Sequence, residues 1–291
     1  MANTRHLRRR IKSVKNTAQI TKAMQMVAAS KMRRAQQQAA GGKPYANLIN
    51  KILVSLREHV DPRSHPLLEQ REVKKELILL VSTDRGLCGP LNTNLFREAA
   101  KCDPETCSFV SVGKKARQFL ARMRRNLLAD FTLDDPITFS ASKKISKFCL
   151  DQFLSGEVDQ VRVAFPEFVN VLIQQPQLAA ILPISPIKMA GIKSESEDLH
   201  QGSVNDYGYL FEPSPSAVLD SIVPHYVHFE IFQMFLDARA SEHSARMVAM
   251  KSATDNANQL VKDLALEYNK VRQAAITTEI LEISTAQMSL A

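Results

Sequence analysis

The chain has 291 residues and a mass of 32.6 kDa, with 45% hydrophobic and 23% charged residues. This is the composition of an ordinary folded protein, and it excludes a disordered, collagen-like or disulfide-rich chain. The longest apolar runs, such as residues 77–81, are far shorter than the roughly 20 residues that cross a bilayer, so no membrane-spanning segment is expected. The four cysteines form no CxxC pair, which argues against a zinc site and a disulfide framework.

Positive charge is concentrated at the start of the chain. Residues 1–60 contain thirteen Lys or Arg residues and a single acid, Glu58, which gives this segment a net charge of +12 against +8 for the whole chain. Such a segment is suited to an acidic partner, whether nucleic acid, anionic lipid or a carboxylate-rich protein surface. Residues 1–44 contain no aromatic side chain that would stack on bases or anchor at a lipid interface, which disfavours the first two.

Both ends of the chain are predicted to form long helices. All nine glycines and all thirteen prolines lie between Gly41 and Pro224, so the first forty and the last sixty-seven residues contain no helix breaker. At 1.5 Å per residue such helices extend roughly 60 and 100 Å, well beyond a typical globular helix. Helices of this length need a partner along much of their surface.

The two terminal segments carry comparable stripes of mostly apolar residues. In the first, a strict alternation of steps of four and three residues lands on Leu7, Ile11, Val14, Ala18, Thr21, Gln25, Ala28, Met32, Ala35 and Ala39. The stripe of the last segment contains one doubled step of four and comprises Ala253, Ala257, Leu260, Leu264, Tyr268, Val271 and Ala275. We therefore expect an antiparallel coiled coil, with Ala18 opposite a residue between Leu260 and Val271.

The middle of the chain alternates predicted strands and helices. Strands are expected at residues 77–81, 109–112, 161–165, 169–173 and 178–184, and helices at 92–101, 114–124 and 143–154. The predicted fold class is α/β: a long antiparallel coiled coil formed by the N- and C-terminal helices, with an inserted Rossmann-like α/β domain. The expected boundaries are 1–60, 61–215 and 216–291, and the polar stretch 193–207 is expected to be a loop.

The turn at residues 84–90 stands where a doubly wound fold would bind phosphate. It contains neither G-x-G-x-x-G nor G-x-x-x-x-G-K-[ST], so we expect no nucleotide to bind there. Cys88 lacks the final glycine of a nucleophile elbow, and a small buried thiol beside a tight turn is the expected state.

The remaining polar motifs are also expected to be structural. Asp134 and Asp135 precede Pro136 and indicate a turn or a helix cap rather than an acid/base pair. Three histidines without metal-ligand spacing are expected on the surface or in the seam: His225, His228 and His243. The sequence therefore predicts no catalytic, cofactor-binding or metal-binding residue.

The run STDRGLCGPLNTN at residues 82–94 resembles the gamma subunit of bacterial F-type ATP synthases. Further blocks agree in order: IKSVKNT, ITKAM and MVAASKM within residues 11–32, YLFEP at 209–213, and ASEH, ARMVAMK, ATDN and YNKVRQAAITTEILEI within 240–283. The resemblance covers essentially the whole chain. It departs at Pro90, where the family usually has a second glycine, and at residues 284–291, which lack the usual glycine-alanine pair.

The resemblance implies a central rotor shaft that couples proton-driven rotation of the c-ring to ATP synthesis or hydrolysis. Its coiled coil would stand inside a hexamer of alternating alpha and beta subunits, and its α/β domain would lie against epsilon and the c-ring. One copy per complex, no catalytic activity of its own and no cofactor are implied. Membrane association would be indirect, through the c-ring, at the cytoplasmic face of a bacterial inner membrane.

The resemblance also implies partner-binding residues. Met24 would lie beside an acidic loop of beta, and Arg272 and Gln273 would contact a beta subunit high on the coil. Tyr209 and Glu212 would belong to the foot on the c-ring. Asp84 and Arg85 are further candidates for a contact with beta. The alternative from charge alone is a basic coiled-coil protein that binds nucleic acid.

Overall fold

A computed structural model of the chain describes residues 2–57, 65–69, 71–184 and 211–290. Its elements are α1 (Ala2–Arg57), β1 (Glu76–Val81), α2 (Leu91–Ala100), β2 (Cys107–Val112), α3 (Lys114–Arg122), β3 (Leu127–Phe131), α4 (Phe139–Leu154), β4 (Gln160–Phe168), β5 (Gln174–Leu182) and α6 (Pro215–Leu290). They form two compact units, one of Met1–Ser30 with Arg246–Ala291 and the other of Lys31–Ala245. We call these unit 1 and unit 2; each contains a part of α1 and a part of α6.

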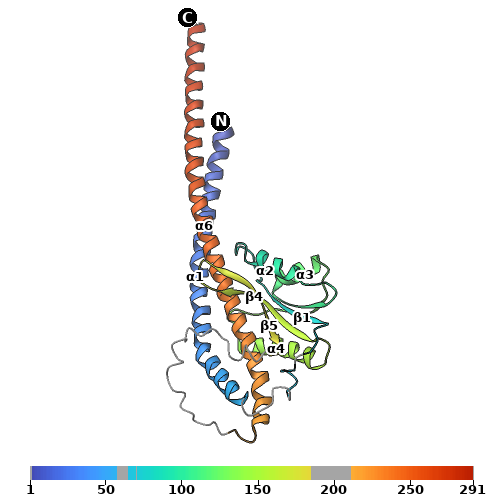
Figure 1. Cartoon of the computed structure of the whole chain (residues 1–291). Coiled ribbons are helices and arrows are strands. Elements are labelled where there is room, and N and C mark those ends of the chain that lie inside the picture. The colour runs from blue at the N-terminus through green and yellow to red at the C-terminus, as the bar shows by residue number, and fades with distance from the viewer. Residues whose placement is uncertain (1, 58–64, 70, 185–210, 291) are drawn as a thin grey trace. The chain divides into compact units, whose positions relative to one another are not determined.

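Unit 1 is the predicted antiparallel coil. Figure 1 shows α1 and α6 side by side, with both chain termini at the same end. The hydroxyl oxygens of Thr21 and Thr254 are 2.7 Å apart, and Arg8 Nη2 donates to the hydroxyl of Tyr268 at 2.7 Å. In an antiparallel pair, opposite residues have a constant sum of residue numbers. Here that sum is about 275, and it defines the register of the coil. This register sets Ala18 opposite Ala257, so the expected window Leu260–Val271 is wrong.

The seam of α1 is confirmed, whereas that of α6 differs from the expectation. Every predicted α1 position from Leu7 to Ala39 is buried or half-buried. On α6 a strict alternation of four and three joins buried or half-buried positions, namely Met250, Thr254, Ala257, Val261, Leu264, Tyr268 and Val271, and the expected Ala253 is half-buried beside them. Leu260 is 38% exposed, so the doubled step does not exist. Thr254 is not in the expected stripe. Its hydroxyl donates to Met250 O and contacts Thr21, which allows it to lie in the seam.

The last part of α6 extends past its partner helix. With Arg8 opposite Tyr268, the start of α1 reaches only to about residue 274 of α6. Residues 272–285 are all exposed. Several apolar side chains of this single helix are more than two-fifths exposed, among them Ile276, Ile280, Leu281, Ile283 and Met288. An apolar helical surface of this kind indicates a protein partner.

Unit 2 contains a five-stranded sheet in the order β3-β2-β1-β4-β5. The first four strands are parallel, and β5 runs antiparallel to β4. Leu77 and Leu79 of β1 face one core, and Ile78 and Leu80 face the other, so this central strand is buried on both sides as expected. A mostly parallel sheet covered on both faces confirms the predicted Rossmann-like α/β domain.

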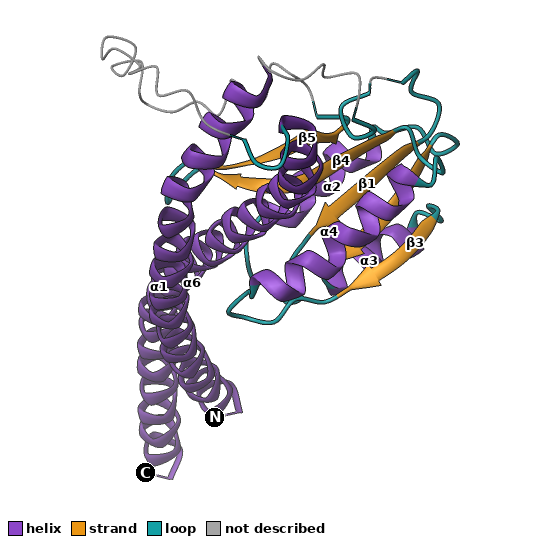
Figure 2. Ribbon diagram, turned by 90° about the horizontal axis from the view of Figure 1, so that it is seen from below, coloured by secondary structure: helices purple, strands orange, loops and turns teal. Residues whose placement is uncertain are grey.

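Helices cover both faces of this sheet. One core joins the sheet to α2 and α3 through residues such as Leu95 and Leu120. The other joins it to α4 and to the unit 2 parts of α1 and α6, through residues such as Leu53, Phe153 and Phe235. Figure 2 shows α3 and α4 beside the strands of this sheet.

One predicted strand of the middle is wrong, and one observed strand was not predicted. Residues 169–173 form the connection between β4 and β5 rather than a strand, because the Asn170 side chain accepts hydrogen bonds from the backbone nitrogens of Leu172 and Ile173. The edge strand β3 was not predicted. Its Asp130 accepts a hydrogen bond from Ser111 of the neighbouring strand, a partner that the local sequence does not reveal.

Both long helices continue through glycine or proline residues, beyond the forty and sixty-seven residues that contain no helix breaker. α1 includes Gly41, Gly42 and Pro44, and α6 includes Pro224. Proline inside a helix costs about 3 kcal/mol, but both segments bury apolar side chains on the sheet of unit 2, which offsets that cost. Gly42 also allows α1 and α6 to approach closely, since a Cβ there would meet the side chain of Gln233.

No helix in the described part of the chain is long and apolar enough to span a membrane. The predicted loop at residues 193–207 lies outside the described residues.

Candidate functional site

The turn after β1 is held rigidly by hydrogen bonds. Thr83 Oγ1 donates to Arg85 O at 2.7 Å and accepts from Asn92 Nδ2 at 2.7 Å. The same amide group donates to the sulfur of Cys88 at 3.4 Å, and Cys88 is buried. The expectation of a small buried thiol is confirmed. The turn also uses positive φ angles at Leu87 (64°) and Gly89 (59°).

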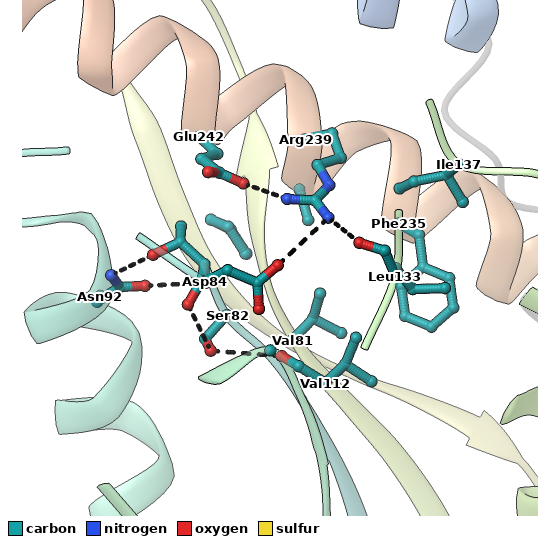
Figure 3. A pocket seen from close by; sticks show the side chains of 14 residues that line it. Val81, Ser82, Asp84, Asn92, Val112, Leu133, Ile137, Phe235, Arg239 and Glu242 are labelled. Carbon is teal, nitrogen blue, oxygen red and sulfur yellow. Dashed lines mark hydrogen bonds and ion pairs between the residues drawn. The ribbon is translucent and has the colours of Figure 1, made fainter. Parts of the chain in front are cut away.

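A small pocket lies at the carboxyl ends of β1 and β2, where doubly wound folds bind ligands (Figure 3). Its lining includes Ser82, Asn92, Gly113 and Leu133, together with Arg239 of α6. The cavity measures about 20 Å³, which is room for about one water molecule. This edge of the sheet is therefore filled by the chain itself.

Arg239 occupies this edge through three interactions. Its guanidinium donates to Leu133 O at 2.6 Å and to Glu242 Oε2 at 2.7 Å. The carboxylate of Asp84 lies 3.9 Å away, and its other oxygen accepts from the backbone nitrogen of Lys114 at 3.0 Å. Figure 3 shows Arg239 pointing from α6 toward Asp84 and Leu133. A largely buried arginine with these partners fixes α6 at the sheet edge.

Asp135 lies in the loop after β3, four residues beyond the end of that strand, and contacts both long helices. Its Oδ2 lies 2.6 Å from Lys31 Nζ of α1 and 3.5 Å from His243 Nε2 of α6. Burial alone would raise the pKa of Asp135. The hydrogen bond from Lys31 and the charges of His243, Lys31 and Arg239 outweigh burial and lower that pKa below its ordinary value.

These interactions differ from the expected roles of the acids and histidines. The helix cap of α4 is Thr138, which accepts from Ala141 N at 3.3 Å, whereas Asp135 forms ion pairs. His228 and His243 were expected on the surface or in the seam, but both are buried in unit 2. His228 Nδ1 lies 2.6 Å from Ser146 Oγ of α4. Sequence spacing could not reveal these partners, which are far away in the chain.

The residues expected to bind partners lie at separate places. Met24 is half-buried in unit 1, whereas Arg272 and Gln273 are exposed on α6 at the level of the first residues of α1. Asp84 and Arg85 lie together in unit 2, with Asp84 engaged as described and Arg85 exposed.

Within the coil register, Met24 and Arg272 are separated by about twenty residues of helix, or roughly 30 Å. Glu212 is exposed just before α6, and Tyr209 lies outside the described residues. The described residues contain no group of three or more His, Cys, Asp or Glu side chains arranged to hold a metal ion.

Comparisons with known proteins cover the full length of the chain. The family model described as ATP synthase matches residues 3–290. The ATP synthase gamma chain of Methylacidiphilum infernorum is 52% identical over 295 aligned positions, and that of Opitutus terrae is 49% identical over 299. Both alignments cover all of this chain and all of the relative.

Solved structures agree in fold. A chain of the Euglena gracilis mitochondrial ATP synthase, in a structure of OSCP, F1 and c-ring, superposes with a TM-score of 0.69 at 20% identity. The match covers 99% of this chain and 95% of that one. A chain of the central stalk and c-ring of the Tetrahymena thermophila enzyme gives a TM-score of 0.63 at 22% identity, covering 80% and 99%. The coil, the inserted α/β domain and the full-length relatives lead to one conclusion: this chain belongs to the ATP synthase family, among its gamma chains.

Proposed function

We propose that this chain is the central rotor shaft of a bacterial F-type ATP synthase, which couples rotation of a proton-driven c-ring to ATP synthesis or hydrolysis. The observation that supports this role most directly is the unpaired end of α6. A single helix with exposed Ile276, Ile280 and Ile283 would be unfavourable in water, but it suits an axle that turns within a collar of partner subunits.

The shaft has no catalytic role in this proposal. The coil stands within a hexamer of alternating alpha and beta subunits, with one copy of the chain per complex. Unit 2 contacts epsilon and the c-ring, and the chain is therefore peripheral at the cytoplasmic face of the inner membrane. The family membership supports this arrangement. ATP hydrolysis would take place in the hexamer and not in this chain.

Two contacts with beta are proposed along the coil. Met24, half-buried on α1 two residues after the exposed Lys22, lies beside an acidic loop of beta. Arg272 and Gln273, exposed on α6 at the level where α1 begins, contact beta nearer the end of the shaft. Asp84 and Arg85 form a third contact with beta, in which the exposed Arg85 presents the charge. An exposed guanidinium is suited to a carboxylate partner.

The segment that contains Tyr209 and Glu212 is proposed to face the c-ring, as part of the end of the shaft nearest the membrane. The exposure of Glu212 supports an interface role for this segment.

Coexpression with the alpha and beta subunits of the same organism tests this function. With an affinity tag on beta, the chain should copurify at one copy per three beta subunits and should confer steady ATP hydrolysis. Arg272→Ala should weaken retention at high salt, whereas Lys270→Ala, a charge-matched change at an exposed neighbour, should not. Absence of the chain from the purified hexamer, together with steeply salt-dependent binding to random DNA, would instead support the nucleic-acid alternative.

A further inference from the structure

One carboxylate in unit 2 meets both long helices. Lys31 of α1 and His243 of α6 approach the same oxygen of Asp135, at 2.6 and 3.5 Å. Their residue numbers sum to 274, within two of the sums at the Thr21–Thr254 and Arg8–Tyr268 contacts of the coil. Lys31 and His243 are therefore at the same level of the helix pair, and Asp135 bridges them there.

A second tie lies one helical turn away on α6. Arg239 precedes His243 by four residues, so the two project from the same side of the helix. Arg239 holds Leu133 O at 2.6 Å, two residues before Asp135 in the chain, and it faces Asp84 after β1 at 3.9 Å. Only 14% of the Arg239 side chain is exposed. We call Lys31, Asp84, Leu133, Asp135, Arg239 and His243 the clamp.

The clamp lies at the limits of unit 2. This unit begins at Lys31 and ends at Ala245, so both helices are held at the residues where each passes into unit 1. Elsewhere in unit 2, α1 and α6 are attached to the sheet by apolar side chains such as Leu53, Val227 and Phe235. To this packing the clamp adds directional charged hydrogen bonds, which oppose rotation of each helix about its own axis at this level.

We propose that Asp135 and Arg239 are positioning residues that lock both shaft helices against rotation relative to the α/β domain, so that torque entering the domain passes into the coil. This inference rests on the proposed rotor function. The loop after β3 supplies both the Asp135 carboxylate and the Leu133 carbonyl, so one short segment holds α1 and α6 together.

Asp135→Asn in the assembled ATP synthase tests the clamp, because it removes the charge and keeps the size. Asp134→Asn is the matched control, since Asp134 is adjacent and exposed and forms no hydrogen bond or ion pair within the described residues. ATP-driven proton pumping per ATP hydrolysed should fall in Asp135→Asn by up to about fivefold, the scale expected for losing an ion pair whose Lys31 and Asp135 side chains are 47% and 34% exposed. It should be unchanged in Asp134→Asn.

The torsional stiffness of the connection between the α/β domain and the shaft helices is a second measurement. It should change only if Asp135 resists rotation of the helices, and not if Asp135 merely stabilises the fold. A bead is attached through Lys144→Cys on the exposed face of α4, in a Cys102→Ser background, while a non-hydrolysable ATP analogue holds the hexamer. The angular spread of the bead should widen in Asp135→Asn and stay at the wild-type width in Asp134→Asn. Both variants should remain folded at the assay temperature, although Asp135→Asn should melt lower because it loses a charged contact that stabilises the fold.

A charge exchange provides the rescue. Lys31→Glu and Asp135→Lys should each lower coupling and stiffness. The double variant should recover part of the loss, because the pair with Lys31 is restored with its signs reversed while the new cation still faces His243 and Arg239.

The outcomes separate the two proposals. If the wild-type chain fails to assemble or to rotate, the rotor function is wrong. If the wild type rotates and couples but Asp135→Asn matches Asp134→Asn in both stiffness and pumping, the clamp is overturned and the rotor function stands.

Discussion

Gly113 follows β2 at a point where the backbone leaves no room for a side chain. Its φ is +95°, and a Cβ would lie 2.5 Å from the backbone oxygen of Ser82. Gly113→Ala should therefore lower the free energy of unfolding by about 2 kcal/mol or more. Gly41→Ala is the matched control, because Gly41 is inside α1 and a Cβ there would meet nothing within 4 Å, so alanine should stabilise by about 0.5–1 kcal/mol. Urea denaturation of both variants measures the difference, and equal stabilities would contradict the assigned backbone geometry.

Met24 offers a test of the proposed contact with beta. Met24→Lys keeps side-chain length and helix propensity, and in the proposed contact it would add a cation facing the carboxylates of beta. An ion pair at a partly desolvated interface is worth on the order of 1–3 kcal/mol more than an exposed one, so it would trap the shaft in one rotary state. We expect near-normal assembly, slower turnover and poorer coupling of proton pumping to hydrolysis.

Met26→Lys is the control for that substitution, because Met26 is on the same helix and 61% exposed. It should leave turnover nearly unchanged. Neutralising the facing beta carboxylate should partly restore Met24→Lys. Two variants that both behave like the wild type at low salt would show that Met24 does not face an acidic surface.

The residues of the turn were easier to anticipate than those of the clamp. The burial of Cys88 follows from a small apolar side chain beside a tight turn, which is a local property. The roles of Asp135 and Arg239 depend on partners more than a hundred residues away in the chain. Local spacing carries no signal for such pairs, and the Asp134–Asp135 sequence alone indicates only a turn.

At the scale of elements, the coil register makes a direct prediction. Cysteines at Ala18 and Ala257 should form a disulfide under mild oxidation, since both positions are buried in the seam and lie opposite each other. Cysteines at Ala18 and Leu264, one heptad further on, should not, because only Cα atoms within about 7 Å can be bridged. Preferential crosslinking of the second pair, followed by non-reducing electrophoresis and mass spectrometry, would contradict the register.

The sequence anticipated the elements that depend on periodicity. The α1 seam and the doubly buried strand β1 are long, regular patterns, and both are confirmed. The errors occurred where hydrogen bonds override hydropathy. Thr254 lies in the seam because Thr21 pairs with it, and Val171 and Leu172 are exposed in a turn organised by Asn170. Helix continuity through Pro224 depends on tertiary packing, which helix propensity does not include.

For the whole molecule, two buried histidines predict a loss of stability in mild acid. Burial lowers the pKa of His65 despite the nearby Asp220, and burial together with Lys143, His225 and Lys147 lowers that of His228 despite Asp151. The unfolded chain therefore binds protons more readily than the folded one. The stabilisation is complete above the ordinary histidine pKa of 6.5 and declines as the pH falls below it.

Chemical denaturation of the full chain between pH 7.5 and pH 5 should show this decline, whose size scales at about 1.4 kcal/mol for each pKa unit of difference. His228→Asn should make the pH dependence shallower, because it keeps a polar partner for Ser146 without a group that titrates. His6→Gln, a change at an exposed histidine of the coil, should leave the slope as it is in the wild type. A wild-type stability that is constant or rises on acidification would contradict the assigned burial of both histidines.

Rotation of the shaft tests the proposed rotor function without intermediate assumptions. The chain is assembled with alpha and beta subunits, the hexamer is fixed to a surface, and a bead is attached at Lys144→Cys of unit 2 in the Cys102→Ser background. We expect ATP to drive the bead in one direction, with three pauses in each revolution, one for every beta subunit. A bead that stays still while the same complexes hydrolyse ATP would contradict the assignment of this chain as the rotor.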